Sequence, residues 1–192
     1  MRIVTPINDG KSNLRRINLY APNSGLHIYY DFIGSAELRE QLSKRILRIG
    51  DKQKRQTNLN ADMTGWAMQN EEPFATLANL AHLKVSEISD IFFNRPDIEW
   101  IIKSCWGVRY KKGDNAFLHD HYPATWSIVY YVLSPKGSST LQFPGASLTL
   151  KPSDGLILIF PGNIEHQVPK SKASSDRIVV SMNFYMKFNN VN

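Results

Sequence analysis

The stretch GDNAFLHDHYPATWSIVYYV, residues 113–132, joins a His-x-His pair to a run of β-branched and aromatic residues. Such a run is typical of a buried strand, and His119 and His121 stand directly before it. Side chains alternate between the two faces of an extended segment, so both imidazoles are expected on one face. The stretch therefore predicts a rigid strand with two potential metal ligands at its start.

A third histidine and an arginine extend this pattern. His166 follows the apolar run 155–160 and the turn formers 161–163, and Arg177 opens the next apolar run. Three imidazoles that leave coordination positions open are typical of a catalytic metal site rather than a structural one. Arg177 can hold an acidic co-substrate beside the metal, because a guanidinium pairs with a carboxylate through two hydrogen bonds. The alternative for Arg177 is a surface ion pair with a neighbour such as Asp176.

The bulk composition indicates an ordinary globular protein. The 192 residues are 42% hydrophobic and 21% charged, which suits one domain over residues 1–192 with a proper core. No apolar run approaches the length of a membrane span, and the first residues do not resemble a secretory signal. Cys105 is the one cysteine, so no internal disulfide can form. We therefore expect a cytoplasmic protein without a membrane partner.

The charge of the chain leaves one open question about partners. The net charge is +6 and the isoelectric point is near 9.4, with a basic cluster at Lys44, Arg45, Arg48 and residues 52–55. Such a cluster can contact nucleic acid or another polyanion. The alternative is a solvated helix face and loop, and no zinc finger, P-loop or RNA-binding signature supports nucleic-acid binding.

The chain divides into a mixed support region, residues 1–97, and a β-rich core, residues 98–192. In the first region we expect strands at 17–20 and 27–32 around a turn at 22–25, a helix from the N-cap Ser35 to Gly50, an irregular stretch at 51–65 and a helix over 73–93. In the second region, short apolar runs alternate with Gly/Pro turns and predict strands at 100–110, 125–133, 139–143, 147–150, 155–160 and 177–188. This pattern is typical of a sandwich or barrel with helices covering one face.

Two known families place histidines in this way. The chain resembles the small-molecule cupins in Gly113 before His119 and His121, and in residues 155–161 before His166. Cupins normally carry a glutamate a few residues after the His-x-His pair, whereas this chain continues with YPATW at 122–126. The missing acidic residue argues against an ordinary cupin.

The chain is more similar to the Fe(II)/2-oxoglutarate-dependent oxygenases, above all to the compact ones of phages and marine bacteria that are related to prolyl hydroxylases. Residues 113–132 look like their first metal motif, 155–166 like their second, and 177–184 like the strand that carries the 2-oxoglutarate arginine. The resemblance covers about residues 105–188. It implies a mainly β protein with flanking helices, built on the double-stranded β-helix, a cupin-like jelly roll.

By this resemblance, His119, His121 and His166 would hold Fe(II). The commonest form of the first motif has aspartate where this chain has His121, so a negative charge is missing from the expected metal shell. Asp120 is the alternative acidic ligand, although strand alternation would point it away from the histidines.

The same resemblance implies roles for residues around the metal. Four residues are expected to contact 2-oxoglutarate: Arg177, Tyr131, Tyr110 and Ser181. If Arg177 faces inward, Val179 and Asn183 share that face with Ser181. Trp126 and Tyr122 are expected to line the substrate mouth.

The sequence thus favours an Fe(II)/2-oxoglutarate-dependent dioxygenase that uses O2 and 2-oxoglutarate, releases succinate and hydroxylates a further substrate. A peptidyl side chain, a metabolite and a nucleobase all fit as that substrate. One alternative is a cupin-type metalloenzyme that does not use 2-oxoglutarate. Another is a non-catalytic binding protein on the same scaffold.

Overall fold

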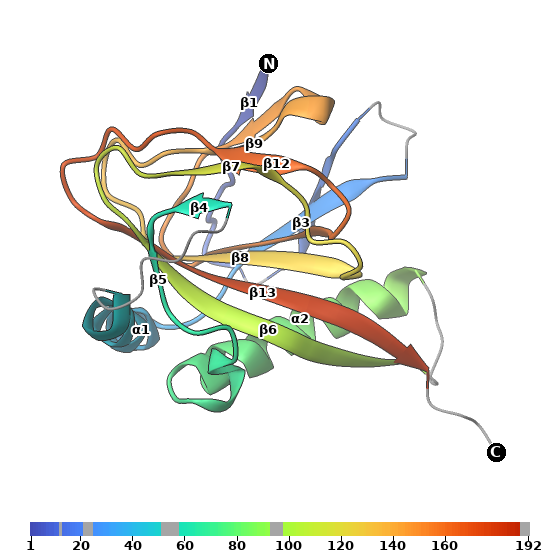
Figure 1. Ribbon diagram of the computed structural model, residues 1–192. Helices are drawn as coiled ribbons and strands as arrows, with labels where there is room; N and C mark the ends of the chain where they lie inside the picture. The colour runs from blue at the N-terminus through green and yellow to red at the C-terminus, as the bar shows by residue number, and fades with distance from the viewer. Residues whose placement is uncertain (12, 21–24, 51–57, 93–97, 189–192) are drawn as a thin grey trace.

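The structure is a computed structural model, and it describes residues 1–11, 13–20, 25–50, 58–92 and 98–188. Within these ranges the strands form two sheets that face each other, and two helices lie along the outer face of the larger sheet (Figure 1). The predicted turn at 22–25 lies largely outside the described residues, and so does the 52–55 part of the basic cluster.

The larger sheet is antiparallel throughout the described residues. Its strands are β2 (Arg15–Asn18), β3 (His27–Phe32), β5 (Asp62–Met63), β6 (Ile98–Tyr110), β8 (Trp126–Leu133), β11 (Leu156–Pro161) and β13 (Arg177–Phe188). They lie in the order β2-β3-β11-β8-β13-β6-β5, so the long strands β8, β13 and β6 occupy neighbouring positions.

The smaller sheet consists of short strands. These are β1 (Arg2–Val4), β4 (Leu59–Asn60), β7 (Asn115–His119), β9 (Leu141–Phe143), β10 (Leu148–Leu150) and β12 (His166–Val168), in the order β1-β10-β9-β12-β7-β4. From β7 onward the chain passes repeatedly between the sheets: β8, β11 and β13 belong to the larger sheet, and the strands between them to the smaller. This alternation builds a double-stranded β-helix, as the sequence predicted.

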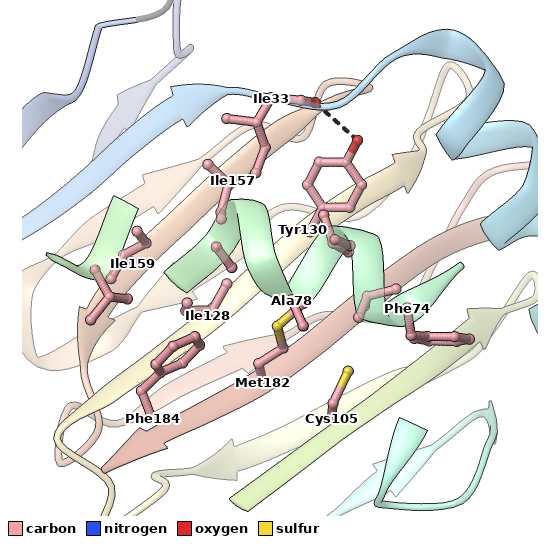
Figure 2. Packing of buried hydrophobic residues seen from close by; sticks show 14 of the residues in the cluster. Ile33, Phe74, Ala78, Cys105, Ile128, Tyr130, Ile157, Ile159, Met182 and Phe184 are labelled. Atoms are coloured by element: carbon pink, nitrogen blue, oxygen red, sulfur yellow. Dashed lines mark hydrogen bonds between the residues drawn. The ribbon is translucent and has the colours of Figure 1, made fainter. Parts of the chain in front are cut away.

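The central strands of the larger sheet are buried on both faces, which explains their nearly continuous apolar runs. In β8, Ile128 and Tyr130 pack toward the helices, whereas Val129 and Tyr131 pack between the sheets. Figure 2 shows the helix-side cluster, in which the Tyr130 hydroxyl donates a 3.0 Å hydrogen bond to the Ile33 carbonyl. Two separate cores therefore lie on either side of one sheet.

Both predicted helices are present. α1 (Ala36–Gly50) begins after Ser35, whose hydroxyl accepts a 3.1 Å hydrogen bond from the Leu38 amide, as an N-cap does. α2 (Phe74–Phe92) turns the fully buried Leu77 and Ile88 toward the sheet. Burial of such a side chain stabilises the fold by roughly 1.5–3 kcal/mol. Neither helix of the described residues has the length and apolar character needed to cross a membrane.

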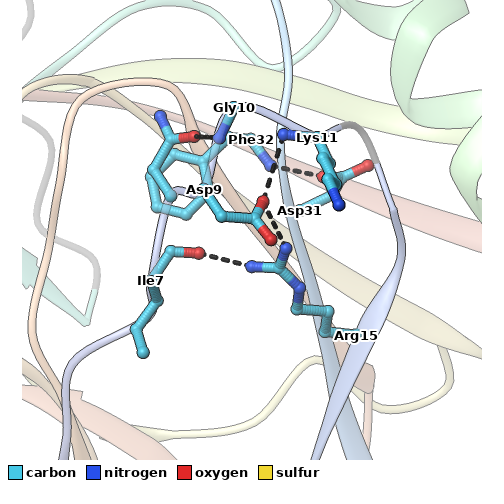
Figure 3. Close-up of polar contacts among 8 residues, drawn as sticks. Ile7, Asp9, Gly10, Lys11, Arg15, Asp31 and Phe32 are labelled. Carbon is cyan, nitrogen blue, oxygen red and sulfur yellow. Dashed lines mark hydrogen bonds and ion pairs between the residues drawn. The ribbon is translucent and has the colours of Figure 1, made fainter.

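The segment before β2 is tied to the edge of the larger sheet by polar contacts (Figure 3). Arg15 forms a 2.5 Å ion pair with Asp9 and donates to the Ile7 carbonyl. On β3, Asp31 is almost fully buried and forms a 2.9 Å ion pair with Lys84 of α2. These contacts tie the N-terminal segment to β2 and the second helix to β3, both strands of the larger sheet.

The structure differs from the sequence-based expectations in the segment 51–65. Residues 51–65 were expected to be irregular, yet the described part contains β4 and β5, which pair with β7 and β6. In the basic cluster, Lys44 pairs with Glu40 at 2.6 Å and Arg45 with Glu71 at 2.5 Å on the exposed side of α1. Nucleic-acid binding by this cluster stays a prediction.

Candidate metal centre and anion pocket

Three histidines from two neighbouring strands converge between the sheets. His119 ends β7, His121 follows it, and His166 begins β12, where it pairs directly with His119 in the sheet. One ring nitrogen from each lies within 4.8 Å of the others. The ring centroids are 4.3 Å apart for His119 and His166, and 5.0 and 5.1 Å from His121 to those two. This spacing allows all three to bind one ion.

Backbone contacts fix which nitrogen faces the centre. Nδ1 of His119 lies 2.7 Å from the Phe117 carbonyl oxygen, and Nδ1 of His166 lies 2.9 Å from that of Ile164. A carbonyl only accepts hydrogen bonds, so Nδ1 carries the proton in both rings and Nε2 keeps its lone pair. Nδ1 of His121 instead faces the amide of Asn183, at 3.5 Å. Nε2 is therefore the free nitrogen of each ring.

Burial keeps these imidazoles neutral, which is the form that binds a metal. Loss of hydration and the neighbouring His119 lower the pKa of His121 to about 4. The same causes, with His121 added, hold the pKa of His166 well below its usual range, and burial also lowers the pKa of His119. At neutral pH the Nε2 lone pairs of His119 and His166 are therefore available, and that of His121 is available when its proton lies on Nδ1.

A backbone contact between two loops sets the position of His121 relative to His166. The His121 amide donates to the Gly162 carbonyl at 2.7 Å, and the Gly162 amide donates to the Thr125 carbonyl at 3.1 Å. A Cβ atom on Gly162 would lie 2.2 Å from the Ala124 carbonyl oxygen. Only glycine permits this approach, so Gly162 brings the two histidine-bearing loops together.

The three histidines line a cavity of about 320 Å³ between the sheets, and Arg177 lines it too. Its side chain is 1% exposed, and its guanidinium carbon lies 4.8 Å from the Tyr110 ring centroid and 5.2 Å from that of Tyr131. Among the described residues, Nε and Nη1 of Arg177 have no hydrogen-bond partner. Asp176 pairs with Arg109 at 2.6 Å and not with Arg177. A buried cation in this state requires an anion.

The tyrosines beside Arg177 supply neutral donors. Burial raises the pKa of Tyr110 to about 12, although the nearby Arg177 acts in the opposite direction. Burial also raises the pKa of Tyr131, again against the effect of Arg177. Both hydroxyls therefore keep their protons at neutral pH and can donate to an anion that pairs with the guanidinium.

Comparison with known proteins identifies the fold. No protein-family model matches the chain, and no curated protein sequence matches it significantly. Solved structures do match. The viral collagen prolyl hydroxylase vCPH from Paramecium Bursaria Chlorella virus-1, in a 2OG complex, is 17% identical with a TM-score of 0.62, covering 81% of this chain and 94% of that one. A prolyl-4-hydroxylase from Pseudomonas putida is 14% identical with a TM-score of 0.64, covering 84% and 94%.

A third similar structure binds a different kind of molecule. HygX from Streptomyces hygroscopicus, with nickel, 2-oxoglutarate and hygromycin B bound, is 11% identical with a TM-score of 0.59, covering 85% of this chain and 83% of that one. The fold is that of the 2OG-Fe(II) oxygenases. The sequence-based prediction of an oxygenase-like double-stranded β-helix is thus confirmed at the level of the fold.

Within this oxygenase fold, some predicted site residues line the cavity, whereas Tyr131, Trp126 and Tyr122 are not among its lining residues. Tyr110 and Ser181 line it together with Arg177. Trp126 was expected at the mouth but packs in the helix-side core, with its ring edge-on to Tyr29 at 6.0 Å. The expectation for Trp126 is wrong, because the alternation of β8 places it on the face opposite Tyr131. Tyr122 is 78% exposed and does not line the cavity.

Asp120 was expected to point away from the histidines. It is exposed at the edge of the cavity, and its carboxylate accepts a 3.1 Å hydrogen bond from the Tyr122 amide. The group of potential metal ligands found among the described residues contains the three histidines and not Asp120.

Two tryptophans near the metal centre were not singled out from the sequence. Trp66 and Trp106 both line the oxygenase-fold cavity, with ring centroids 4.8 Å apart, and Trp106 lies 5.8 Å from the His121 ring. Trp106 sits opposite Ser181 in the β6–β13 register, on the same inner face. Trp106 could therefore have been predicted to face the cavity once β13 was paired with β6, because Ser181 faces inward and lies directly opposite it.

Proposed function

We propose that this protein is an Fe(II)- and 2-oxoglutarate-dependent dioxygenase that hydroxylates its substrate. One observation carries the proposal: a single cavity holds three neutral histidines arranged for one ion and a buried arginine whose Nε and Nη1 have no hydrogen-bond partner among the described residues. The first feature fits a metal and the second fits a carboxylate. The fold of the solved 2OG-Fe(II) oxygenases supports the combination.

The histidines fit the metal by their chemistry. Imidazole is a good ligand for Fe(II), and three protein ligands leave positions open for a co-substrate. His119, His121 and His166 would bind through Nε2, with Nδ1 of His119 and His166 already held by backbone carbonyls. The protein supplies no carboxylate from position 121, so the negative charge at the metal has to come from the co-substrate.

The charges in the cavity fit 2-oxoglutarate. A divalent metal on neutral histidines and the cation of Arg177 make the cavity positive, and Asp120 is the one acidic residue among those lining it. A five-carbon dianion can place one carboxylate at each positive centre. Arg177 would bind the distal carboxylate through its fork, and the hydroxyls of Tyr131, Tyr110 and Ser181 would donate to the same end.

In the proposed reaction, the chain positions the reactants and excludes water. When bound, the metal and the keto acid together supply the oxidation: O2 is consumed, 2-oxoglutarate becomes succinate and CO2, and one oxygen atom passes to the substrate. Val129 and Val179 form apolar parts of the cavity wall, which keep water from the reacting atoms.

The nature of the primary substrate is left open by the similar proteins. HygX is solved with hygromycin B, and a prolyl hydroxylase from Trichoplax adhaerens with a peptide fragment, so one fold serves chemically distinct substrates. A peptidyl side chain, a metabolite and a nucleobase remain the candidates for this chain. We further propose that residues 1–192 act as one domain, because helices and edge strands from the first half pack on the β core. The cytoplasmic location stays an expectation from the sequence.

The test is an anaerobic titration of the Fe(II)-loaded protein with 2-oxoglutarate, followed by the visible charge-transfer absorption that chelation of Fe(II) by a keto acid produces. We expect the absorption in wild type and its loss in His166→Ala. Bound Fe(II) without this absorption at saturating 2-oxoglutarate would contradict the proposal and favour a cupin-type metalloenzyme. Binding of a polyanion without any bound metal would favour the non-catalytic alternative.

A further inference from the structure

An asparagine and a serine on the inner face of the larger sheet lie behind His121. Asn183 of β13 and Ser127 of β8 are cross-strand partners, 8% and 1% exposed. The Ser127 hydroxyl donates to Oδ1 of Asn183 at 3.3 Å, and Nδ2 of Asn183 lies 3.5 Å from Nδ1 of His121. Side chains from two central strands thus form a short chain that ends at one potential metal ligand.

His121 needs such a contact more than the other two histidines do. His119 ends β7 and His166 begins β12, and each ring is held by a backbone carbonyl two residues earlier. His121 lies beyond β7, and its Nδ1 faces a side-chain amide instead of a carbonyl. Its orientation therefore depends on a residue distant in sequence.

The chemistry of the amide suits this task. A histidine that turns Nε2 to a metal carries its proton on Nδ1, and that proton requires an acceptor. Asn183 has one in Oδ1, because a half-turn of the amide exchanges its oxygen and nitrogen while the surrounding atoms keep their places. The Ser127 hydroxyl both donates and accepts, so it can pair with either end of the amide.

We propose that Asn183, oriented by Ser127, is the positioning residue of His121: it accepts the Nδ1 proton and so turns Nε2 toward His119 and His166. The inference rests on the metal site of the proposed function. It also explains how histidine replaces an acidic residue at position 121. A carboxylate has no ring tautomer to fix, whereas an imidazole needs a defined partner at its second nitrogen.

The test compares Co(II) affinity of the full chain in four proteins. Asn183→Leu keeps the size of the side chain and removes the acceptor, and Asn183→Asp keeps an acceptor. The matched control is Asn60→Ala, since Asn60 is an exposed asparagine whose side chain contacts Asn115 and no histidine. Loss of a second partner of a ligating histidine typically costs about 10–100-fold in metal affinity, and we expect this loss in Asn183→Leu alone.

A second measurement separates positioning from a general structural role. Nitrogen-15 NMR of the Zn(II)-loaded protein reports the tautomer of each histidine. We expect a hydrogen-bonded Nδ1 proton on His121 in wild type and Asn183→Asp, and its loss in Asn183→Leu. If Asn183→Leu does not fold, the wild-type spectrum still decides, because a His121 ring without an Nδ1 proton overturns the inference.

The outcomes distinguish this inference from the proposed function. Weaker Co(II) binding in Asn183→Leu, with unchanged binding in Asn60→Ala, supports the role of Asn183 even if 2-oxoglutarate does not bind. Equal Co(II) affinity in folded wild type and Asn183→Leu overturns that role even if 2-oxoglutarate does bind. Failure of the wild type to bind Co(II) overturns both.

Discussion

Substitution of Gly162 by alanine should separate the metal ligands while leaving their chemistry intact. The added Cβ atom would lie 2.2 Å from the Ala124 carbonyl oxygen, whereas ordinary contacts begin at 3.4 Å. The two loops must therefore move apart by 3.4 − 2.2 = 1.2 Å. The amide of Ala124 donates to the His121 carbonyl at 2.8 Å, so His121 moves with this loop. Metal–ligand distances tolerate only about 0.2 Å, and such a shift cannot be absorbed without loss of a ligand.

We expect Gly162→Ala to lower Co(II) affinity by at least about 100-fold, similar to the cost of a 1 Å misplacement in a catalytic site. Forcing the extra methyl into the loop contact should also lower the free energy of unfolding by about 1–3 kcal/mol. Co(II) titration and urea denaturation measure the two effects.

The matched control is Gly145→Ala in the 3₁₀ helix Pro144–Ala146. Its Cβ would meet the nearest atom, the Tyr20 hydroxyl, at 3.6 Å, which is an ordinary contact. Metal affinity and stability should therefore stay near wild type in this variant. Wild-type Co(II) affinity in a folded Gly162→Ala protein would refute the reasoning, since it would show that the His121 loop adapts without moving its ligand.

Three further predictions follow from burial and charge. Arg177→Lys should weaken 2-oxoglutarate binding by about 2–5 kcal/mol with Co(II) affinity unchanged, because an ammonium cannot form the paired hydrogen bonds; unchanged keto-acid affinity by calorimetry would contradict this. The pKa of His121 falls from 6.5 to about 4 on folding, so without metal, in the presence of EDTA, the free energy of unfolding should fall as the pH drops from 6.5 to 4. Urea titrations should show a smaller fall in His121→Asn, and an equal fall would exclude His121 as the cause. Burial raises the pKa of Cys105 to about 12, so the native protein at pH 8 should not react with a thiol reagent that labels the urea-unfolded chain, and rapid native labelling would show that β6 opens.

The alternation of side chains along strands predicted several of the residues that line the cavity. The error for Trp126 arose where this alternation was not applied. In β13, alternation from Arg177 predicted that Val179 and Ser181 face inward, and both line the cavity. Carried one step further back along β8, the alternation that groups Ser127 with Tyr131 would have placed Trp126 on the opposite face, where it lies. Asp120 lies outside the group of potential metal ligands, although β7 already ends at His119, an end that a sequence pattern does not mark to within one residue.

Other features depended on contacts that no local pattern encodes. β4 and β5 contain two residues each and exist only because β7 and β6 offer free edges to them. The approach of the loops at Gly162 and the two rings around Arg177 depend on how strands far apart in sequence are paired. The sequence could therefore predict which residue types meet in the cavity. The residues that orient them could be identified only once the pairing register of the strands was known.

The burial of β8 on both faces restricts how this protein can change in evolution. Neighbouring residues of the strand pack on opposite faces of the sheet, Tyr130 in the helix-side core and Tyr131 in the core between the sheets. Insertion or deletion of one residue would exchange the two sets of side chains, removing the hydroxyl beside Arg177 and driving Trp126 toward the histidines. Relatives should consequently diverge in β8 by substitution while keeping its length, and length changes should collect in the connections between strands. A search for distant relatives can use the constant spacing within β8, such as that between Ser127 and Tyr131, even where sequence identity has disappeared.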